Sequence, residues 1–170
     1  MLTADDYLKC DVYKQILDEV ENDLYKNSVF KSLKNFSSRK KGKYLEMLYS
    51  EYILKKDPNN VVEKSENSGH DRLVSKEKKE IKGSFLWGNG THFRWQQIRP
   101  SQDYDAVVFV AVYPDRIEFY EADEETVRLN VEVKNEKGEW IHNQHGGKQV
   151  NSGAFFLDGF PSDFPWMKRI

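Results

Sequence analysis

Three residues near the middle of the sequence have the side chains that metal-assisted hydrolysis requires. Asp71 is separated by eight residues from Glu80-Ile81-Lys82. Because side chains alternate between the two faces of a strand, Glu80 and Lys82 share one face while Ile81 points into the core. Two converging carboxylates offer the hard oxygen ligands that Mg²⁺ prefers, and an adjacent ammonium group can position or deprotonate a water. The pattern therefore predicts metal-assisted hydrolysis of a phosphodiester.

This prediction depends on how Asp71 pairs with the strand that carries Glu80. If Asp71 lies on the preceding strand of a hairpin, a turn with an even number of residues places it opposite Glu80 or Lys82, on the same face. A three-residue turn would place Asp71 opposite Ile81 and separate the carboxylates. The sequence favours two short strands, at residues 71–74 and 79–85, which are connected by a charged turn at residues 75–78.

The residues before the motif have the spacing of two helices. Apolar side chains recur every four residues after an N-cap residue, Thr3, and predict an amphipathic helix that reaches about Lys26. A second helix is expected to begin near Ser38, and Asp57-Pro58 ends it. The apolar side chains of the first helix are Leu8, Val12, Ile16, Val20 and Leu24.

The residues after the second helix predict strands and turns. Asp105–Tyr113 is a nearly unbroken run of β-branched and aromatic residues, which is typical of a central strand buried on both faces. Arg116–Tyr120 is expected to pair antiparallel with it. A short strand is expected at Val61-Val62, whereas the structure of His92–Arg99 is ambiguous. We expect a single α/β domain, mainly helical over residues 1–57 and sheet-bearing over residues 58–170.

In this context the motif resembles the PD-(D/E)XK nuclease superfamily, whose fold is called restriction-endonuclease-like. Gly69-His70-Asp71 stands in place of the usual Pro-Asp, and Glu80-Ile81-Lys82 matches the (D/E)XK element. The strings WQQIR, DYDAVVFVAV and QHGG add to the resemblance, which covers about residues 41–156. The resemblance implies a mixed central β-sheet flanked by helices, with an N-terminal helical segment.

The resemblance also implies a role for each residue of the motif. Asp71 and Glu80 would bind Mg²⁺, for which Mn²⁺ substitutes, together with the backbone carbonyl of Ile81. Lys82 would assist the attacking water. Many members carry a further acid on the preceding helix, and Glu46 is the natural candidate, either for a second metal or for orienting the other ligands. The implied products have 5′-phosphate and 3′-hydroxyl ends.

Basic and amide side chains on either side of the motif are candidates for DNA contacts. Arg can bind guanine or phosphate, and Gln can bind adenine. The cluster around Trp95 fits equally well a protein surface with that tryptophan buried. His142 and His145 lie in a Gly-flanked loop, which we expect to contact DNA or cover the site rather than to bind zinc. The candidate contacts are Arg39, Lys41, Lys43, Arg94, Gln96, Gln97, Arg99 and His145.

Composition and charge exclude several classes of protein. No window approaches the roughly 18–20 apolar residues of a membrane span, the N-terminus lacks a secretory signal, and the single Cys10 cannot form an intramolecular disulfide. We expect a soluble, cytoplasmic protein. The net charge of −2 hides an uneven distribution, because residues 31–100 carry 16 Lys/Arg and 8 Asp/Glu, whereas residues 101–140 carry 4 and 11. The basic segment contains the motif and can face phosphates.

The sequence therefore predicts a Mg²⁺-dependent endonuclease of restriction-enzyme type that acts on double-stranded DNA. Because one site per subunit must cut both strands, we expect a homodimer or a higher homo-oligomer. The nearest alternative is an enzyme of the same fold with another target, such as a homing endonuclease, a junction resolvase or a repair nickase. An inactive DNA-binding module is an alternative from another class, against which the presence of Asp71, Glu80 and Lys82 argues.

Overall fold

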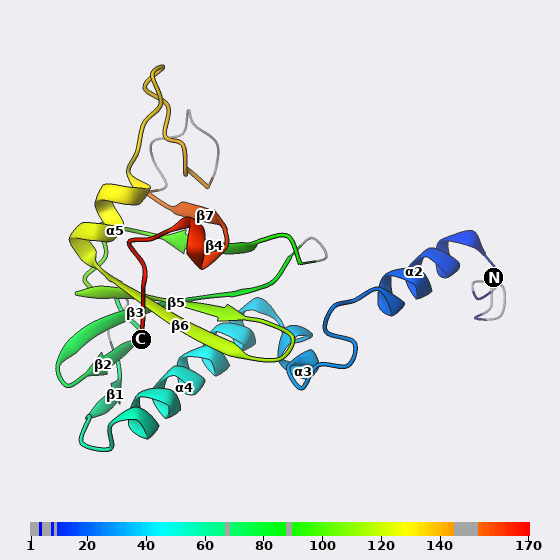
Figure 1. The fold of residues 1–170 in the computed structure, drawn as a ribbon, viewed down its shortest axis with the longest axis horizontal. Helices are drawn as coiled ribbons and strands as arrows, with labels where there is room; N and C mark the ends of the chain where they lie inside the picture. Colours follow the sequence, from blue (N-terminus) through cyan, green and yellow to red (C-terminus); the bar gives the residue numbers. More distant parts are fainter. Residues whose placement is uncertain (1–3, 5–7, 9, 67–68, 88–89, 145–152) are drawn as a thin grey trace.

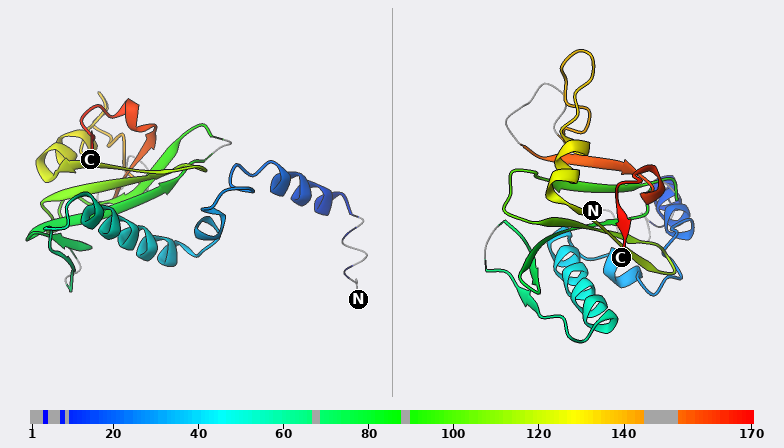
Figure 2. Two further views of the ribbon diagram at one scale, coloured as in Figure 1. Left: turned by 60° about the horizontal axis from the view of Figure 1, so that its bottom comes forward. Right: turned by 60° about the vertical axis from the view of Figure 1, so that its left-hand side comes forward.

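A computed structural model of the chain shows a six-stranded mixed sheet with a long helix on one face and a two-stranded ribbon on the other (Figures 1 and 2). The structure describes all residues except 1–3, 5–7, 9, 67–68, 88–89 and 145–152. The helices are α2 (Asp11–Glu21), α3 (Lys31–Lys34), α4 (Ser38–Lys56) and α5 (Glu124–Val131), with a 3₁₀ turn at Pro161–Asp163. The strands are β1 (Val62–Lys64), β2 (Arg72–Val74), β3 (Glu77–Phe85), β4 (Phe93–Ile98), β5 (Ala106–Val112), β6 (Ile117–Asp123), β7 (Phe155–Gly159) and β8 (Lys168–Arg169).

The main sheet has the strand order β1-β2-β3-β5-β6-β8. Only the β3–β5 pair is parallel, and the other pairs are antiparallel. The prediction of an α/β protein with a mixed central sheet and flanking helices is confirmed. The chain between the parallel strands passes through β4, which leaves the sheet and pairs antiparallel with β7 in the ribbon. The ambiguous stretch His92–Arg99 is thus mostly a strand.

Strand β5 lies between two hydrophobic cores, as its sequence predicts. All seven of its residues are buried. Val107, Phe109 and Ala111 face the core that the ribbon and α5 cover, and the alternate residues face the core under α4. Trp95 of β4 is fully buried in the first of these cores, and its indole N–H donates to the carbonyl of Val110. The burial of both faces explains why this strand shows no polar alternation.

The helices follow the sequence prediction in part. Helix α4 spans Ser38–Lys56, as expected. The first predicted helix appears as α2, which projects away from the sheet (Figure 1) and ends at Glu21, so the predicted end near Lys26 is wrong. Its expected N-cap, Thr3, lies outside the described residues. Helix α5 was not predicted, although Asp123 caps it by accepting a hydrogen bond from the backbone N–H of Thr126 at 2.8 Å. None of the helices in the described part of the chain is long and apolar enough to span a membrane.

Candidate active site

A two-residue turn connects β2 to β3. Ser75 and Lys76 have φ angles of 49° and 78°, and positive values at both positions are typical of the tightest hairpin turns. The predicted turn, Ser75–Lys78, is too long by two residues, because Glu77 already pairs in the sheet. Both lengths are even, so the correction leaves the predicted face of each side chain unchanged.

The register of this hairpin brings Asp71 next to Glu80. Arg72 pairs with Lys79, so Asp71, one residue before β2, lies across from Glu80. One oxygen of the Asp71 carboxylate, Oδ2, accepts a hydrogen bond from the backbone N–H of Ile81 at 2.8 Å. Because the N–H and C=O of a strand residue point to the same side, the Ile81 carbonyl is also directed toward the end of β2.

Glu80 and Lys82 share one face of β3, as predicted, and form an ion pair. The Lys82 Nζ and the Glu80 Oε1 are 2.5 Å apart. Glu80 is buried, whereas Ile81 between them packs into the core under α4. Burial raises the pKa of Glu80; the Lys82 ammonium opposes this effect, whereas the negative charges of Asp71 and Glu46 add to it. The site therefore concentrates more negative charge than its one lysine offsets.

Glu46 reaches the same site from α4. Its Oε2 lies 2.9 Å from Nη1 of Arg72, a buried residue whose Nε donates to Ser50 on the same helix. Burial raises the pKa of Glu46, the charge of Asp71 raises it further, and Arg72 lowers it. Sequence reasoning missed Arg72; the only signal for it is its position next to Asp71, where a charged residue points from the sheet toward α4.

Gly83 explains how α4 comes close enough to place Glu46 there. A Cβ atom at this position would lie 2.1 Å from Cδ1 of Leu45, the buried residue that precedes Glu46. The absence of a side chain on β3 thus lets α4 pack directly on the strand that carries Glu80.

The donor set is suited to a hard divalent cation. It comprises the second oxygen of Asp71, the Glu80 carboxylate and the Ile81 carbonyl, with Glu46 nearby. Among the described residues, no three side chains of His, Cys, Asp or Glu form a complete ligand cluster, so a backbone carbonyl and water would have to complete the coordination. Oxygen ligands of this kind and the mutual repulsion of the carboxylates fit Mg²⁺ or Mn²⁺.

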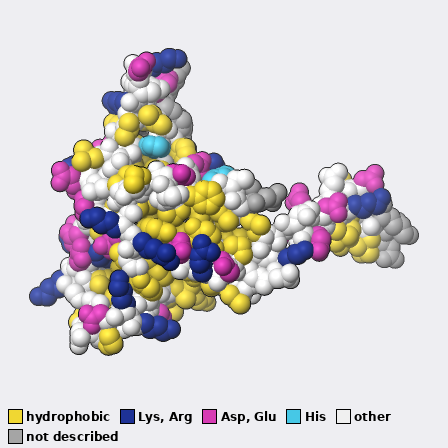
Figure 3. All heavy atoms as spheres, in the orientation of Figure 1, with side chains coloured by type: hydrophobic (Ala, Val, Ile, Leu, Met, Phe, Trp, Pro, Cys, Tyr) yellow, Lys and Arg dark blue, Asp and Glu magenta, His cyan; other side chains and the backbone are white. Residues whose placement is uncertain are grey.

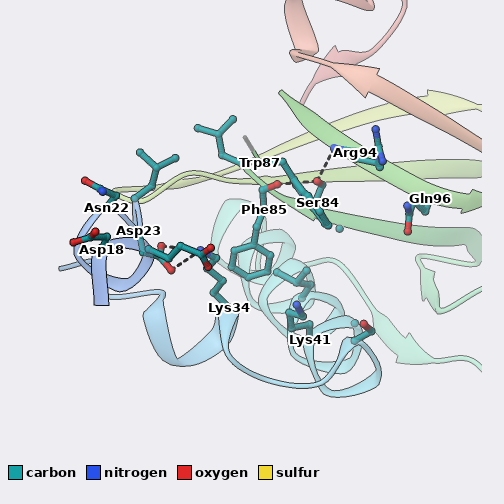
Figure 4. Close-up of a pocket in the computed structure, with 17 residues that line it drawn as sticks. Asp18, Asn22, Asp23, Lys34, Lys41, Ser84, Phe85, Trp87, Arg94 and Gln96 are labelled. Carbon is teal, nitrogen blue, oxygen red and sulfur yellow. Dashed lines mark hydrogen bonds and ion pairs between the residues drawn. The ribbon is translucent and has the colours of Figure 1, made fainter. Parts of the chain in front are cut away.

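A cleft of about 830 Å³ is lined by Leu45 and Gly83, the sequence neighbours of Glu46 and Lys82, and by three of the predicted DNA contacts; Asp18, Glu19 and Asp23 line it as well. Lys41 lines it from α4, whereas Arg94 and Gln96 line it from β4 (Figure 4). Ser84, two residues after Lys82 on the same face of β3, also borders the cleft and accepts a hydrogen bond from the backbone N–H of Arg94 at 2.8 Å. Ser84 thus connects the cleft to the face of β3 that carries Lys82, although none of the side chains of Asp71, Glu80, Lys82 and Glu46 lines the cleft.

The other predicted DNA contacts have different surroundings. Within the described residues, neither Arg39 nor Lys43 takes part in an ion pair, and both are exposed near the start of α4. The side chain of Gln97 accepts from Arg99 at 2.6 Å, and its backbone N–H donates to Gln144. His145 lies outside the described residues.

Arg94 is already engaged within the protein. Its guanidinium donates two hydrogen bonds to Asp158 of β7, at 2.7 and 2.6 Å. This pair holds the two strands of the ribbon together, and it neutralises a charge that the sequence assigned to DNA. Contact between Arg94 and a phosphate would require Asp158 to share or release the Arg94 guanidinium.

Comparison with known proteins adds no further constraint: no protein-family model and no curated protein matches this sequence.

Proposed function

We propose that this protein is a Mg²⁺-dependent endonuclease that hydrolyses phosphodiester bonds in double-stranded DNA. The observation that carries the proposal is the hairpin register that places Asp71 across from Glu80, which is paired with Lys82, with Glu46 of α4 near enough for its charge to raise the pKa of Glu80. The two glutamates have raised pKa values because burial and neighbouring negative charge disfavour their ionised forms. A bound cation would relieve that repulsion. The resemblance to PD-(D/E)XK nucleases, with a restriction-endonuclease-like core, supports the same proposal.

Each residue has a distinct role in the proposed reaction. Asp71 is held by the Ile81 N–H through Oδ2, which leaves Oδ1 to bind the cation together with Glu80 and the Ile81 carbonyl. The cation, when bound, would supply Lewis-acid polarisation of the phosphate and lower the pKa of a water. Lys82 is released from Glu80 and orients the attacking water, and hydrolysis leaves a 5′-phosphate and a 3′-hydroxyl. Arg72 keeps Glu46 near the site.

The proposed path of the DNA follows the basic end of α4 and the cleft. Lys41, Arg39 and Lys43 would contact phosphates, and Gln96 is exposed in the cleft, where it can reach a base edge. Phosphate contacts release counterions, so DNA binding should weaken steeply as salt concentration increases. Cleavage of both strands of a duplex favours two copies of the site, and therefore a homodimer.

Plasmid cleavage in the presence of MgCl₂ tests the proposal directly. The wild-type protein should convert supercoiled DNA to linear DNA, and Lys82→Ala should slow this reaction by about 10²–10⁴-fold, the usual contribution of a group that transfers or positions a proton. Asp71→Asn should abolish it. Lys137→Ala, at an exposed residue in a distant turn, is the matched control and should cut at the wild-type rate.

Equal cutting by the wild type, Asp71→Asn and Lys82→Ala would reject this site. A four-way junction and a nicked duplex, tested beside the intact duplex, separate the related activities. Preference for the junction would indicate a resolvase, and single-strand cutting would indicate a nickase. Binding of DNA without cleavage in either Mg²⁺ or Mn²⁺ would identify an inactive DNA-binding module.

A further inference from the structure

Helix α2 has an apolar face that the rest of the described chain does not cover. None of its residues is buried. Val12, Ile16 and Val20, which lie along one side, are 64%, 48% and 57% exposed, and Leu17 beside them is 51% exposed. Figure 3 shows hydrophobic side chains gathered on one side of this projecting helix. An isolated helix of 11 residues is marginal in water, and an amphipathic one is normally stabilised by packing of its apolar face.

Helix α4 has apolar side chains on two opposite faces. Leu45 and Tyr49 are buried against the sheet. At 100° per residue, Met47 and Leu54 point away from the sheet and Tyr44 and Leu48 lie on one flank, and each of these four side chains is 37–46% exposed. We call this surface the outer face of α4; it consists of Tyr44, Met47, Leu48 and Leu54. Tyr44, Met47 and Leu48 have the i, i+3, i+4 spacing of a helix-packing surface, and Glu51 occupies the next position of that series, i+7.

The two helices carry opposite charges. The 11 residues of α2 include four acidic side chains and one lysine, whereas the 19 residues of α4 include six basic and two acidic side chains. The charges of α2 lie mainly on the side opposite its apolar face, so that they would flank a helix–helix contact. An acidic helix packed on a basic one gains favourable electrostatic interactions at the rim of the contact in addition to apolar burial.

The acidic end of α2 lines the cleft beside the start of α4, but the apolar side chains of α2 do not line it. Only Asn22 lies between the end of α2 and Asp23, whose carboxylate binds Nζ of Lys34 at 2.7 and 2.8 Å. Two residues further on, Tyr25 is fully buried, and its hydroxyl donates to the Val112 carbonyl. The chain is therefore fixed almost immediately after α2, and α2 points outward from the sheet in Figure 1 and in the left view of Figure 2.

We propose that two copies of this chain exchange their α2 helices, so that the apolar face of each α2 packs on the outer face of α4 in the other copy. Both surfaces are present on every chain, so one reciprocal exchange covers all four of them. Such an arrangement has two-fold symmetry and closes at the dimer. Because α4 also carries Glu46, the contact would lie on the helix that positions one carboxylate of the candidate active site.

Sedimentation over a range of protein concentrations tests the exchange. The wild type should be a dimer, whereas Ile16→Glu and Met47→Glu, on the two sides of the contact, should each be monomeric. Leu129→Glu, on the exposed side of α5, is the matched control and should remain a dimer. Circular dichroism would show that all variants keep their folded core. A wild type that is monomeric at every concentration, or an Ile16→Glu variant that still dimerises, would overturn the proposal.

Cross-linking identifies the surface that receives α2. In a Cys10→Ala background, one protein carries Ile16→Cys and another carries Met47→Cys; after mixing, a flexible bismaleimide should join the two proteins. A product of Ile16→Cys with itself would show that α2 pairs with α2. An internal cross-link in a monomer carrying both cysteines would show that α2 folds back on its own α4. Either result would refute the exchange, and neither depends on whether the protein cuts DNA.

Discussion

Glu118 and Glu80 are both buried glutamates of the main sheet, but their surroundings differ. Glu118, on β6, accepts hydrogen bonds from the Tyr120 hydroxyl at 2.8 Å and from Arg116 at 3.0 Å, and it pairs with Arg169 of β8 at 2.9 Å. Burial alone would raise the pKa of Glu118, but these three partners lower it below its usual value. Glu80 has one cationic partner, Lys82, and its pKa is raised.

The contrast distinguishes a carboxylate whose charge its neighbours compensate from one that we propose binds a cation. At Glu118, two guanidinium groups and a hydroxyl compensate the buried charge and tie β8 to β6. Around Glu80, by contrast, two further acids add negative charge: Glu46, which is paired with Arg72, and Asp71, which accepts a hydrogen bond from a backbone N–H. Raised pKa values in a group of neighbouring acids are typical of functional sites, where a bound cation can compensate the negative charge.

The largest expected effect is stabilisation of the wild type by Mg²⁺. A ligand at 100 times its dissociation constant adds about 2.7 kcal/mol to the free energy of unfolding, which for a chain of this size is a rise in Tm of roughly 5–10 °C. Asp71→Asn should lose this rise because one ligand is gone. Glu118→Gln should keep it, although its Tm without metal is lower. A thermal shift of equal size in Asp71→Asn and the wild type would place the ion elsewhere.

A smaller effect is expected from Glu118→Gln in the absence of metal. The substitution removes the charge that holds Arg116 and Arg169. Loss of these hydrogen bonds should lower the free energy of unfolding by about 1–2 kcal/mol. The loss is no larger because both arginines are largely exposed, and solvent screens their ion pairs with Glu118. Urea denaturation measures it. Glu136→Gln, at an exposed turn, is the control and should be neutral. A neutral Glu118→Gln would mean that the Glu118 cluster contributes no stability.

The smallest effect is on the pH dependence of stability. As pH falls, the contributions of Glu118 and Glu80 to the free energy of unfolding should change in opposite directions. Because the pKa of Glu118 is lowered by folding, its stabilisation is present above about pH 4.5 and is lost as pH falls below that value. The pKa of Glu80 is raised, so its contribution is most favourable at low pH and is lost as pH rises through the folded pKa. Denaturation in EDTA should show that the stability of wild type relative to Glu118→Gln falls with acidification, whereas its stability relative to Glu80→Gln rises. If both stability differences changed with pH in the same direction, the proposed difference between Glu118 and Glu80 would be wrong.

Local periodicity was sufficient to predict several parts of this protein. The alternation of a strand placed Glu80 and Lys82 on one face, and the apolar run of β5 predicted burial on both sides. The apolar spacing and the Asp57-Pro58 pair gave the bounds of α4. Each of these features depends on the geometry of one element, which its own side chains specify.

Other features were decided by contacts between distant segments. The two-residue turn at Ser75-Lys76 could not be distinguished from a longer even turn, because neither residue is the glycine or asparagine that such turns favour. Sequence spacing also does not show that Arg72 would bind Glu46 across the α4–sheet contact. The pairing of β4 with β7, nearly 60 residues later in the chain, likewise has no local signal.

Helix α2 combines a feature that its own residues specify with one that contacts between distant segments set. The sequence alone determined that this segment is a helix with one apolar face, because 3.6-residue periodicity is a local property. That this face stays uncovered follows from long-range contacts, because the buried side chain of Tyr25 and the Asp23–Lys34 pair fix the direction in which the helix leaves the domain. The sequence likewise supplied the acids of the candidate active site, but packing of α4 on Gly83 and the hairpin register brought them together.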